Sequence, residues 1–110
     1  MTLFERIAAR EIPSDIVFED DLCFALRDIT PKAPVHILIV PKRVIARVAE
    51  AGPDDAGLLG HLLLTAARVA KAEGLTGFRL VVNNGADAGE TIPHLHIHLL
   101  GGRPLGWPPG

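Results

Sequence analysis

Three histidines alternate with apolar residues near the end of this 110-residue chain, in the run His94-Leu95-His96-Ile97-His98-Leu99-Leu100. The chain holds five histidines, so three of them lie within five consecutive positions. In a β-strand, residues two apart in sequence share one face. We therefore expect a strand over residues 94–100, with the three imidazoles on one face and the alternate apolar residues packed into a core.

The histidine face has three possible interpretations: a polar strand surface, a metal site, or a catalytic centre. A strand rises ~3.3 Å per residue, so the outer two α-carbons lie ~13 Å apart. That separation is too long for three imidazoles to converge on one zinc ion with bonds of ~2 Å. Two neighbouring histidines with a distant third ligand remain compatible with a metal. The spacing favours the third interpretation, a histidine nucleophile whose neighbours orient it and bind the charge of an extended substrate.

Charge and cysteine content narrow the class of protein. The formal net charge of −2 does not favour nucleic-acid binding. The single cysteine, Cys23, excludes an internal disulfide and a cysteine-rich zinc site, and it fits a small buried apolar position. The charged N-terminal turns do not resemble a signal peptide, and the longest apolar stretch is too short to cross a bilayer. We expect a cytoplasmic protein without membrane contact.

Residues 1–110 are expected to form a single α+β domain. Thr2 and Glu5 make a capping box that opens a short helix to about Arg10. A long helix is expected to begin after Asp54 or Asp55, to run to about Glu73 and to stop at Gly74. Strands are expected at the following positions: 16–19, 23–28, 35–40, 78–83 and 94–100. Hairpin connections favour an antiparallel sheet with a helix on one face.

The segment 84–93 joins the last two expected strands and is rich in small residues. Gly85 and Gly89 allow a close backbone approach, and several N–H groups of such a loop can turn toward an anion. Pro93 holds Ile92 extended and stiffens the approach to His94. By itself this loop is weak evidence for an anion-binding site. The evidence is stronger because the loop ends where the histidines begin.

The run at 94–100 fits the motif His-x-His-x-His-x-x, with apolar x, and so resembles the histidine triad (HIT) superfamily. Further segments match the Hint branch, the histidine triad nucleotide-binding proteins, in order and spacing: Arg10-Glu11-Ile12-Pro13, Phe18-Glu19-Asp20-Asp21, Asp28-Ile29-Thr30-Pro31, Pro34-Val35-His36-Ile37-Leu38-Ile39-Val40-Pro41-Lys42, Leu58-Leu59-Gly60-His61-Leu62, Val81-Val82-Asn83, Leu100-Gly101-Gly102-Arg103 and Trp107-Pro108-Pro109-Gly110. The transferase branch has glutamine in place of the third histidine. The dinucleotide-cleaving branch generally lacks the Gly-Gly-Arg and Trp-Pro-Pro-Gly tail.

The resemblance implies a homodimer in which two five-stranded antiparallel sheets join into one of ten strands, each subunit having one long and one short helix. It also implies hydrolysis of purine nucleoside phosphoramidates, in which AMP or GMP is linked through nitrogen to an amine. No metal and no cofactor is implied. Two other functions stay open: a nucleotide-binding adaptor with incidental turnover, and a metal-binding protein that uses His94 and His96.

The same resemblance assigns roles to five residues around the phosphate. His96 is expected to be the nucleophile, and it forms a nucleotidyl-histidine intermediate. His98 and His36 are expected to bind the α-phosphate oxygens, and His94 to orient the centre. Thr91 is expected to donate its hydroxyl to the leaving nitrogen.

Other positions are expected to bind the rest of the nucleotide. Asn83 and the backbone N–H groups around Gly89 and Thr91 would cradle the phosphate, and Asp28 would hold the ribose hydroxyls. An alternative role for Asp28 is to cap the turn before Pro31. The tail 103–110 would reach the partner subunit's site, where Trp107 selects among substrates.

Two residues depart from the family pattern. Glu90 stands where glutamine is frequent, and a carboxylate there is expected to weaken anion binding or to raise the pKa of a neighbouring imidazole. Thr91 replaces a serine and keeps the hydroxyl. His61 is expected to be structural or interfacial. The basic residues Lys32, Lys42, Arg43 and Arg47 are expected to be solvated surface charges.

Overall fold

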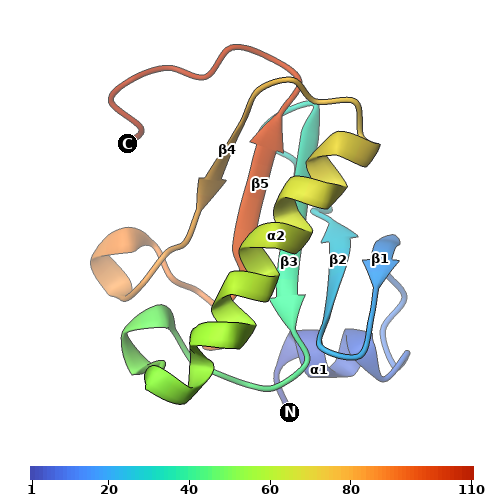
Figure 1. The fold of residues 1–110 in the computed structure, drawn as a ribbon, viewed down its shortest axis with the longest axis vertical. Helices are drawn as coiled ribbons and strands as arrows, with labels where there is room; N and C mark the ends of the chain where they lie inside the picture. Colours follow the sequence, from blue (N-terminus) through green and yellow to red (C-terminus); the bar gives the residue numbers. More distant parts are fainter.

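The computed structural model describes all residues from 1 to 110 and contains one five-stranded antiparallel sheet (Figure 1). The strands follow the order β1-β2-β3-β5-β4 across the sheet. Their bounds are Ile16–Glu19 for β1, Cys23–Arg27 for β2, Val35–Pro41 for β3, Phe78–Val81 for β4 and Ile97–Gly101 for β5. The predicted α+β fold with one long and one short helix is confirmed.

Helix α1 spans Leu3–Ala8 and helix α2 spans Ala56–Ala72. Three short 3-10 turns accompany them: η1 at Val48–Glu50, η2 at Pro53–Asp55 and η3 at Ala86–Ala88. Neither helix combines the length and the hydrophobicity that a transmembrane segment requires.

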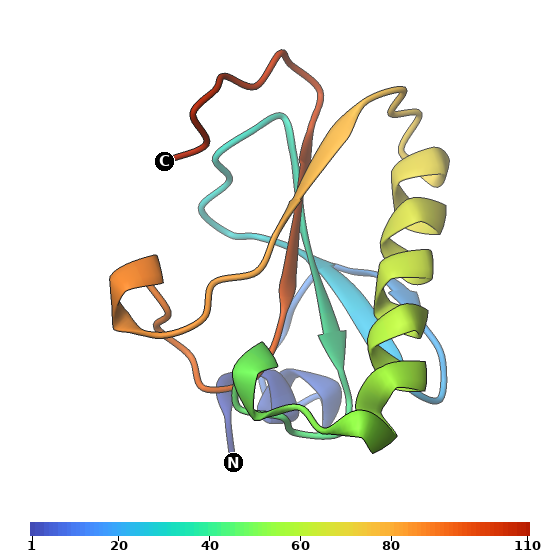
Figure 2. The same cartoon turned by 60° about the vertical axis from the view of Figure 1, so that its left-hand side comes forward.

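The two faces of the sheet carry separate cores. Figure 2 shows α2 lying along one face, while the segment with η3 projects from the other. The core under α2 is the larger: Cys23, Ala25, Ile37, Ile39, Ile45, Leu62, Ala66, Val69, Ala70, Leu95, Ile97 and Leu99. The opposite face is closed by α1 over a smaller core: Phe4, Ile7, Phe24, Leu26, Leu38 and Val40. Because Leu95, Ile97 and Leu99 point to the α2 side, the histidines between them belong to the α1 side.

The capping box of α1 is present as predicted. The Thr2 hydroxyl accepts from the Glu5 N–H at 3.1 Å, and the Glu5 carboxylate accepts from the Thr2 N–H at 2.8 Å. The helix ends at Ala8, two residues before the predicted end, and Arg10 follows with a left-handed φ of 64°. The short helix thus directs the chain back toward β1.

Helix α2 has the predicted extent. Thr65 is buried on its inner face, whereas Leu63 is half exposed. Asp55 stands at the N-cap position, yet its carboxylate accepts from the Gly52 N–H of the preceding 3-10 turn. Gly74 follows the helix with a φ of 75°, which ends it as predicted.

The last strand begins later than predicted, at Ile97 instead of His94. The residues before it leave the ladder because other groups hold them: the Leu95 N–H donates to the Ile45 carbonyl, and the His94 ring bonds the Pro41 carbonyl. Strand β4 also ends at Val81 instead of Asn83. The alternation of buried and less buried residues nevertheless continues from 95 to 99.

Candidate active site

His94 is fully buried, and both of its ring nitrogens are bonded. Its Nε2 lies 2.8 Å from the Pro41 carbonyl oxygen, which can only accept, so Nε2 carries the proton. Its Nδ1 therefore has the lone pair and accepts from the Thr2 hydroxyl at 2.6 Å. The ring of Phe4 packs edge-on against it at 5.4 Å between centroids. Helix α1 thus fixes both the position and the tautomer of His94.

His96 is oriented by the backbone of His94. Its Nδ1 lies 2.8 Å from the His94 carbonyl oxygen and must donate to it. The proton is thereby held on Nδ1, and Nε2 keeps a free lone pair. Phe4 contacts this ring as well, at 5.0 Å between centroids, and the His98 ring lies 5.0 Å away on the other side.

A chain of hydrogen bonds assigns the remaining two imidazoles. The Lys32 N–H donates to Nδ1 of His36 at 3.0 Å, so the proton of His36 is on Nε2. That Nε2 donates to Nδ1 of His98 at 2.9 Å. The proton of His98 is therefore on its own Nε2, which is free to donate to a ligand. Both nitrogens of His36 are engaged, so in this structure His36 orients His98, and its contact with a phosphate oxygen stays a prediction.

Burial keeps three of these imidazoles neutral. It lowers the pKa of His36 and of His94, and it lowers the pKa of His98 to about 4 with further contributions from the neighbouring His96 and His36. Near neutral pH the hydrogen-bond chain is thus preserved, because a protonated His98 would lose its acceptor at Nδ1.

These pKa values predict a pH-dependent stability. Below the ordinary histidine pKa of 6.5 the unfolded chain binds protons that the buried imidazoles of the native protein do not. The free energy of unfolding should therefore be constant above pH 6.5 and fall as the pH drops toward 4. Urea denaturation at several pH values measures this. The His98→Gln variant should show a shallower slope over the same range, and an equal slope would contradict the assignment.

The Thr2 hydroxyl predicts a second effect that can be measured. Thr2→Val removes both the cap and the donor to His94, whereas Glu5→Ala weakens only the cap. We expect Thr2→Val to lower kcat about tenfold more than Glu5→Ala, because only the first variant leaves a buried His94 nitrogen unpaired. Thr2→Ser should retain activity. Equal kcat values for Thr2→Val and Glu5→Ala would limit Thr2 to helix capping.

Asp28 lies beside the histidines and also caps a turn. One carboxylate oxygen accepts from the Thr30 N–H at 2.8 Å, which is the alternative role that the sequence suggested. The other oxygen lies 3.5 Å from Nε2 of His36. The side chain is one-fifth exposed, so it retains surface toward a ligand.

The loop after β4 is held by a charged pair that sequence reasoning missed. Nε and Nη2 of Arg47 donate to the two oxygens of Glu90 at 2.9 and 3.0 Å, and the Gly85 N–H also donates to Glu90. The expectation that Arg47 is a solvated surface charge is therefore wrong. Hydrogen bonds from Arg47 and from the Gly85 N–H lower the pKa of Glu90 to about 2, so it remains a paired carboxylate.

The other predicted loop residues surround this pair. Gly85 and Gly89 have φ values of 87° and 84°, a region that favours glycine, and they flank η3. Asn83 is half-buried directly beyond β4, and Thr91 is exposed just before the histidines. The structure thus brings the loop and the triad to the same side of the sheet.

An apolar cavity of about 270 Å³ is lined by Phe4 and Asp28, which lie beside the histidines, and no local sequence pattern predicts it. Eight of its twelve lining residues are hydrophobic. They come from α1 and the loop after it, from β2 and the loop after it, from β3 and from the loop before the triad: Leu3, Phe4, Ile7, Ile12, Leu26, Ile29, Leu38 and Ile92. Asp28 also lines it, and Ile29 at its rim is 95% exposed.

The donor set does not fit a metal site built from His94 and His96. Both nitrogens of His94 already bond protein groups, and only Nε2 of His96 is free. Ligand atoms of Asp28, His36 and His98 lie within 4.8 Å of one another. The Lys32 N–H occupies Nδ1 of His36 and so holds the proton on Nε2, the nitrogen that faces the group, so these residues are better described as part of the imidazole chain.

Comparisons with known proteins agree with this geometry. The HIT domain family model matches residues 9–105. An uncharacterised HIT-like protein of Synechococcus elongatus is 60% identical over 110 residues, which cover 99% of this chain and 96% of that protein. The chain belongs to the HIT family. The adenylylsulfatase HINT1 of Arabidopsis thaliana is 49% identical over 112 residues, covering 99% of this chain and 76% of the plant protein, so the assignment to the Hint branch is also supported.

A solved structure shows the same HIT fold at full length. The crystal structure of a HIT family hydrolase from Legionella pneumophila Philadelphia 1 superimposes with a TM-score of 0.98 at 48% identity, and 100% of both chains is covered. The family and its solved neighbours support hydrolase activity for this chain.

Proposed function

We propose that this HIT protein hydrolyses purine nucleoside phosphoramidates, in which AMP or GMP is joined through nitrogen to an amine. The observation that carries the proposal is the tautomer of His96. Its Nδ1 proton is held by the His94 carbonyl, so the Nε2 lone pair is available to attack phosphorus. Beside it, the Nε2–H of His98 is available to stabilise negative charge on a phosphate oxygen.

The apolar cavity supports a purine nucleoside as the ligand. A flat base would lie between α1 and the exposed Ile29, where it would cover apolar surface that is otherwise exposed to solvent. Asp28 lines the same cavity next to His36, at the place where ribose hydroxyls would lie between base and phosphate. Asn83, Gly89 and Thr91 would contact the phosphate from the loop.

The proposed reaction has two displacements at phosphorus. In the first, Nε2 of His96 forms a bond to phosphorus while the bond to the amine nitrogen breaks; that nitrogen takes up a proton from solvent, and Thr91 assists by donating a hydrogen bond to it. In the second, water attacks phosphorus and the bond to Nε2 breaks. The oxygen of the water passes to the released nucleoside monophosphate, and one of its protons returns to solvent.

A second candidate substrate class is a nucleotide with sulfate as the leaving group. The observation that favours it is the name of the Arabidopsis relative, an adenylylsulfatase. Attack by His96 would be the same, but sulfate needs no proton to leave. A comparison of kcat/KM for adenylyl sulfate and for an adenosine phosphoramidate, measured above and below pH 7, separates the two classes.

Mass spectrometry of the intact protein tests the proposal directly. Brief mixing with an adenosine phosphoramidate, followed by alkaline quench to preserve the acid-labile bond between phosphorus and imidazole, should give an adduct with the mass of one adenylyl group, and the same experiment in excess chelator should give the same adduct. A nucleotide-binding adaptor would bind AMP without an adduct. Loss of the adduct on chelation and its return with zinc would instead support metal-dependent chemistry.

We also propose that the protein is a homodimer. Strand β4 lies at the edge of the sheet, and an apolar groove next to it is lined by Val48, Leu59, Leu62, Leu63, Val82, Leu95 and Ile97. Trp107 is 82% exposed and has the Arg79 guanidinium over its ring at 5.9 Å. A two-fold partner would cover both regions symmetrically and join the sheets into ten strands. The proposed location is the cytoplasm, which suits the free thiol of Cys23.

The proposed dimer predicts a substrate-selective role for the tail. Deletion of residues 103–110 should change kcat/KM unequally among substrates that differ only in their leaving amine, because Trp107 would lie near the leaving group of the partner subunit. AMP affinity should be unchanged, since the cavity and the triad precede the cut. Steady-state kinetics with three amines measures this, and a uniform change for all three would make Trp107 a packing residue.

A further inference from the structure

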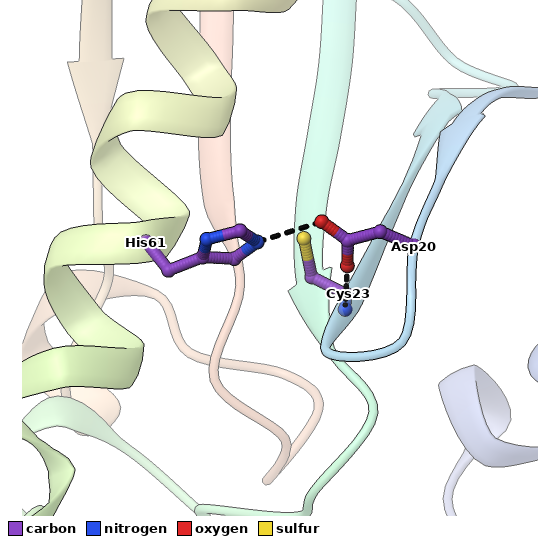
Figure 3. A group of neighbouring side chains, drawn as sticks. All are labelled: Asp20, Cys23 and His61. Atoms are coloured by element: carbon purple, nitrogen blue, oxygen red, sulfur yellow. Dashed lines mark hydrogen bonds and ion pairs between the residues drawn. The ribbon is translucent and has the colours of Figure 1, made fainter.

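Three metal-binding side chains of different chemistry meet on the sheet face opposite the triad. Asp20 lies in the turn between β1 and β2, Cys23 is the first residue of β2, and His61 comes from α2 (Figure 3). Figure 3 shows the sulfur of Cys23 beside the contact between the His61 ring and the Asp20 carboxylate. The proposed reaction uses none of these residues.

The distances are close to those of a tetrahedral metal site. One ligand atom from each residue lies within 4.8 Å of the other two. Around a zinc ion with bonds of about 2.0–2.3 Å, ligand atoms stand about 3.3–3.8 Å apart. The Asp20 carboxylate and Nε2 of His61 are now 2.7 Å apart in a hydrogen bond, so they would separate slightly as an ion enters between them.

The surroundings already orient each ligand. One oxygen of Asp20 accepts from the N–H groups of Leu22 and Cys23, which turns its second oxygen toward His61. The Cys23 sulfur lies 3.7 Å from the Thr65 hydroxyl, which can reverse its hydrogen bond and donate to a thiolate. Asp20 and His61 are about one-third exposed while Cys23 is buried, so an ion has a path from solvent with sulfur at the base of the site.

We propose that Asp20, Cys23 and His61 bind a zinc ion that links the β1–β2 turn to α2, with water as the fourth ligand. Thiolate and imidazole favour zinc over magnesium or calcium. On binding, the Cys23 S–H bond breaks, a bond from sulfur to zinc forms and one proton passes to solvent. The Nε2–H of His61 now donates to Asp20; on binding, this proton leaves Nε2, Nδ1 carries the ring proton, and the Nε2 lone pair binds zinc. The carboxylate and the thiolate together balance the two positive charges of the ion.

Cobalt substitution tests this site in the whole protein. Metal-free protein titrated with Co²⁺ should develop the near-ultraviolet charge-transfer band of a thiolate–cobalt bond, and added Zn²⁺ should abolish it. Because Cys23 is the chain's single cysteine, the band reports this site alone. His61→Gln, at a partly exposed position, should weaken Zn²⁺ binding at least about 100-fold in a chelator competition, and Cys23→Ala should lose the band.

His96→Ala is the matched control, because it removes the imidazole with a free nitrogen from the other face of the sheet. Its cobalt band should equal that of the unmodified protein. Circular dichroism confirms that each variant is folded. The proposal is overturned if excess Co²⁺ gives no band, if His61→Gln develops the band at the same Co²⁺ concentrations as the unmodified protein, or if the band disappears in His96→Ala. Failure of this site leaves the adenylyl adduct experiment unaffected, since that experiment includes chelator.

Discussion

His96→Ala is expected to lower kcat by at least about 10³-fold while AMP binds within about threefold of its normal affinity. The reason is the distribution of hydrogen bonds. His98, His36 and Asp28 are held by Lys32 N–H, by Thr30 N–H and by one another, so removal of the His96 ring leaves the other nucleotide contacts in place. Steady-state kinetics with an adenosine phosphoramidate and calorimetry with AMP measure the two quantities.

A control variant separates the loss of a nucleophile from a disturbance of the site. His61→Ala removes a partly exposed histidine on the other side of the sheet and should leave kcat within twofold. The adenylyl adduct should be absent in His96→Ala and present in this control. If His96→Ala kept more than a few per cent of the activity, a nucleotidyl-histidine intermediate at this position would be ruled out.

Arg47→Met is expected to raise KM about tenfold or more, with a smaller change in kcat. Without its partner, the Glu90 carboxylate would face an anionic substrate at the loop where the phosphate is proposed to bind. Steady-state kinetics with substrates that share a leaving group but differ in phosphate charge measures this effect. The increase in KM should be largest for the substrate with the most negative phosphate.

The double variant Arg47→Met/Glu90→Gln tests whether the effect is electrostatic. It removes both charges, and KM should return to within about threefold of the original value. Glu90→Gln alone should leave KM equal or lower, since Arg47 would then add positive charge. Two results would show that the pair only shapes the loop. The KM of Arg47→Met could be unchanged, or it could be raised and not be restored by the second substitution.

Local patterns predicted much of this structure. The alternation at 94–100 indicated which face the histidines occupy, and Thr2 with Glu5 indicated the start of α1. These predictions succeed because periodicity and capping depend on residues close in sequence. The late start of β5 was not predictable in this way, because it follows from the Pro41 carbonyl competing for His94.

The missed features all join residues that are distant in sequence. Thr2 bonds His94, and Arg47 bonds Glu90, so no local pattern marks either pair. The bond between His36 and His98 has the same origin: the place of His36 on a buried strand was evident, but its partner His98, 62 residues away, was not. The apolar cavity needs the fold itself, since its lining comes from several separate segments.

The late start of β5 has a consequence for how the protein loses activity. His98 lies in the sheet, paired across to Leu38 on one side and Val81 on the other, whereas His96 lies before the ladder and depends on α1 through His94 and Phe4. Short terminal helices open more readily than central strands. Detachment of the six residues of α1 would thus inactivate the enzyme while the sheet stays intact. On warming, activity should therefore be lost at a lower temperature than the one at which the sheet unfolds, and it should return on cooling.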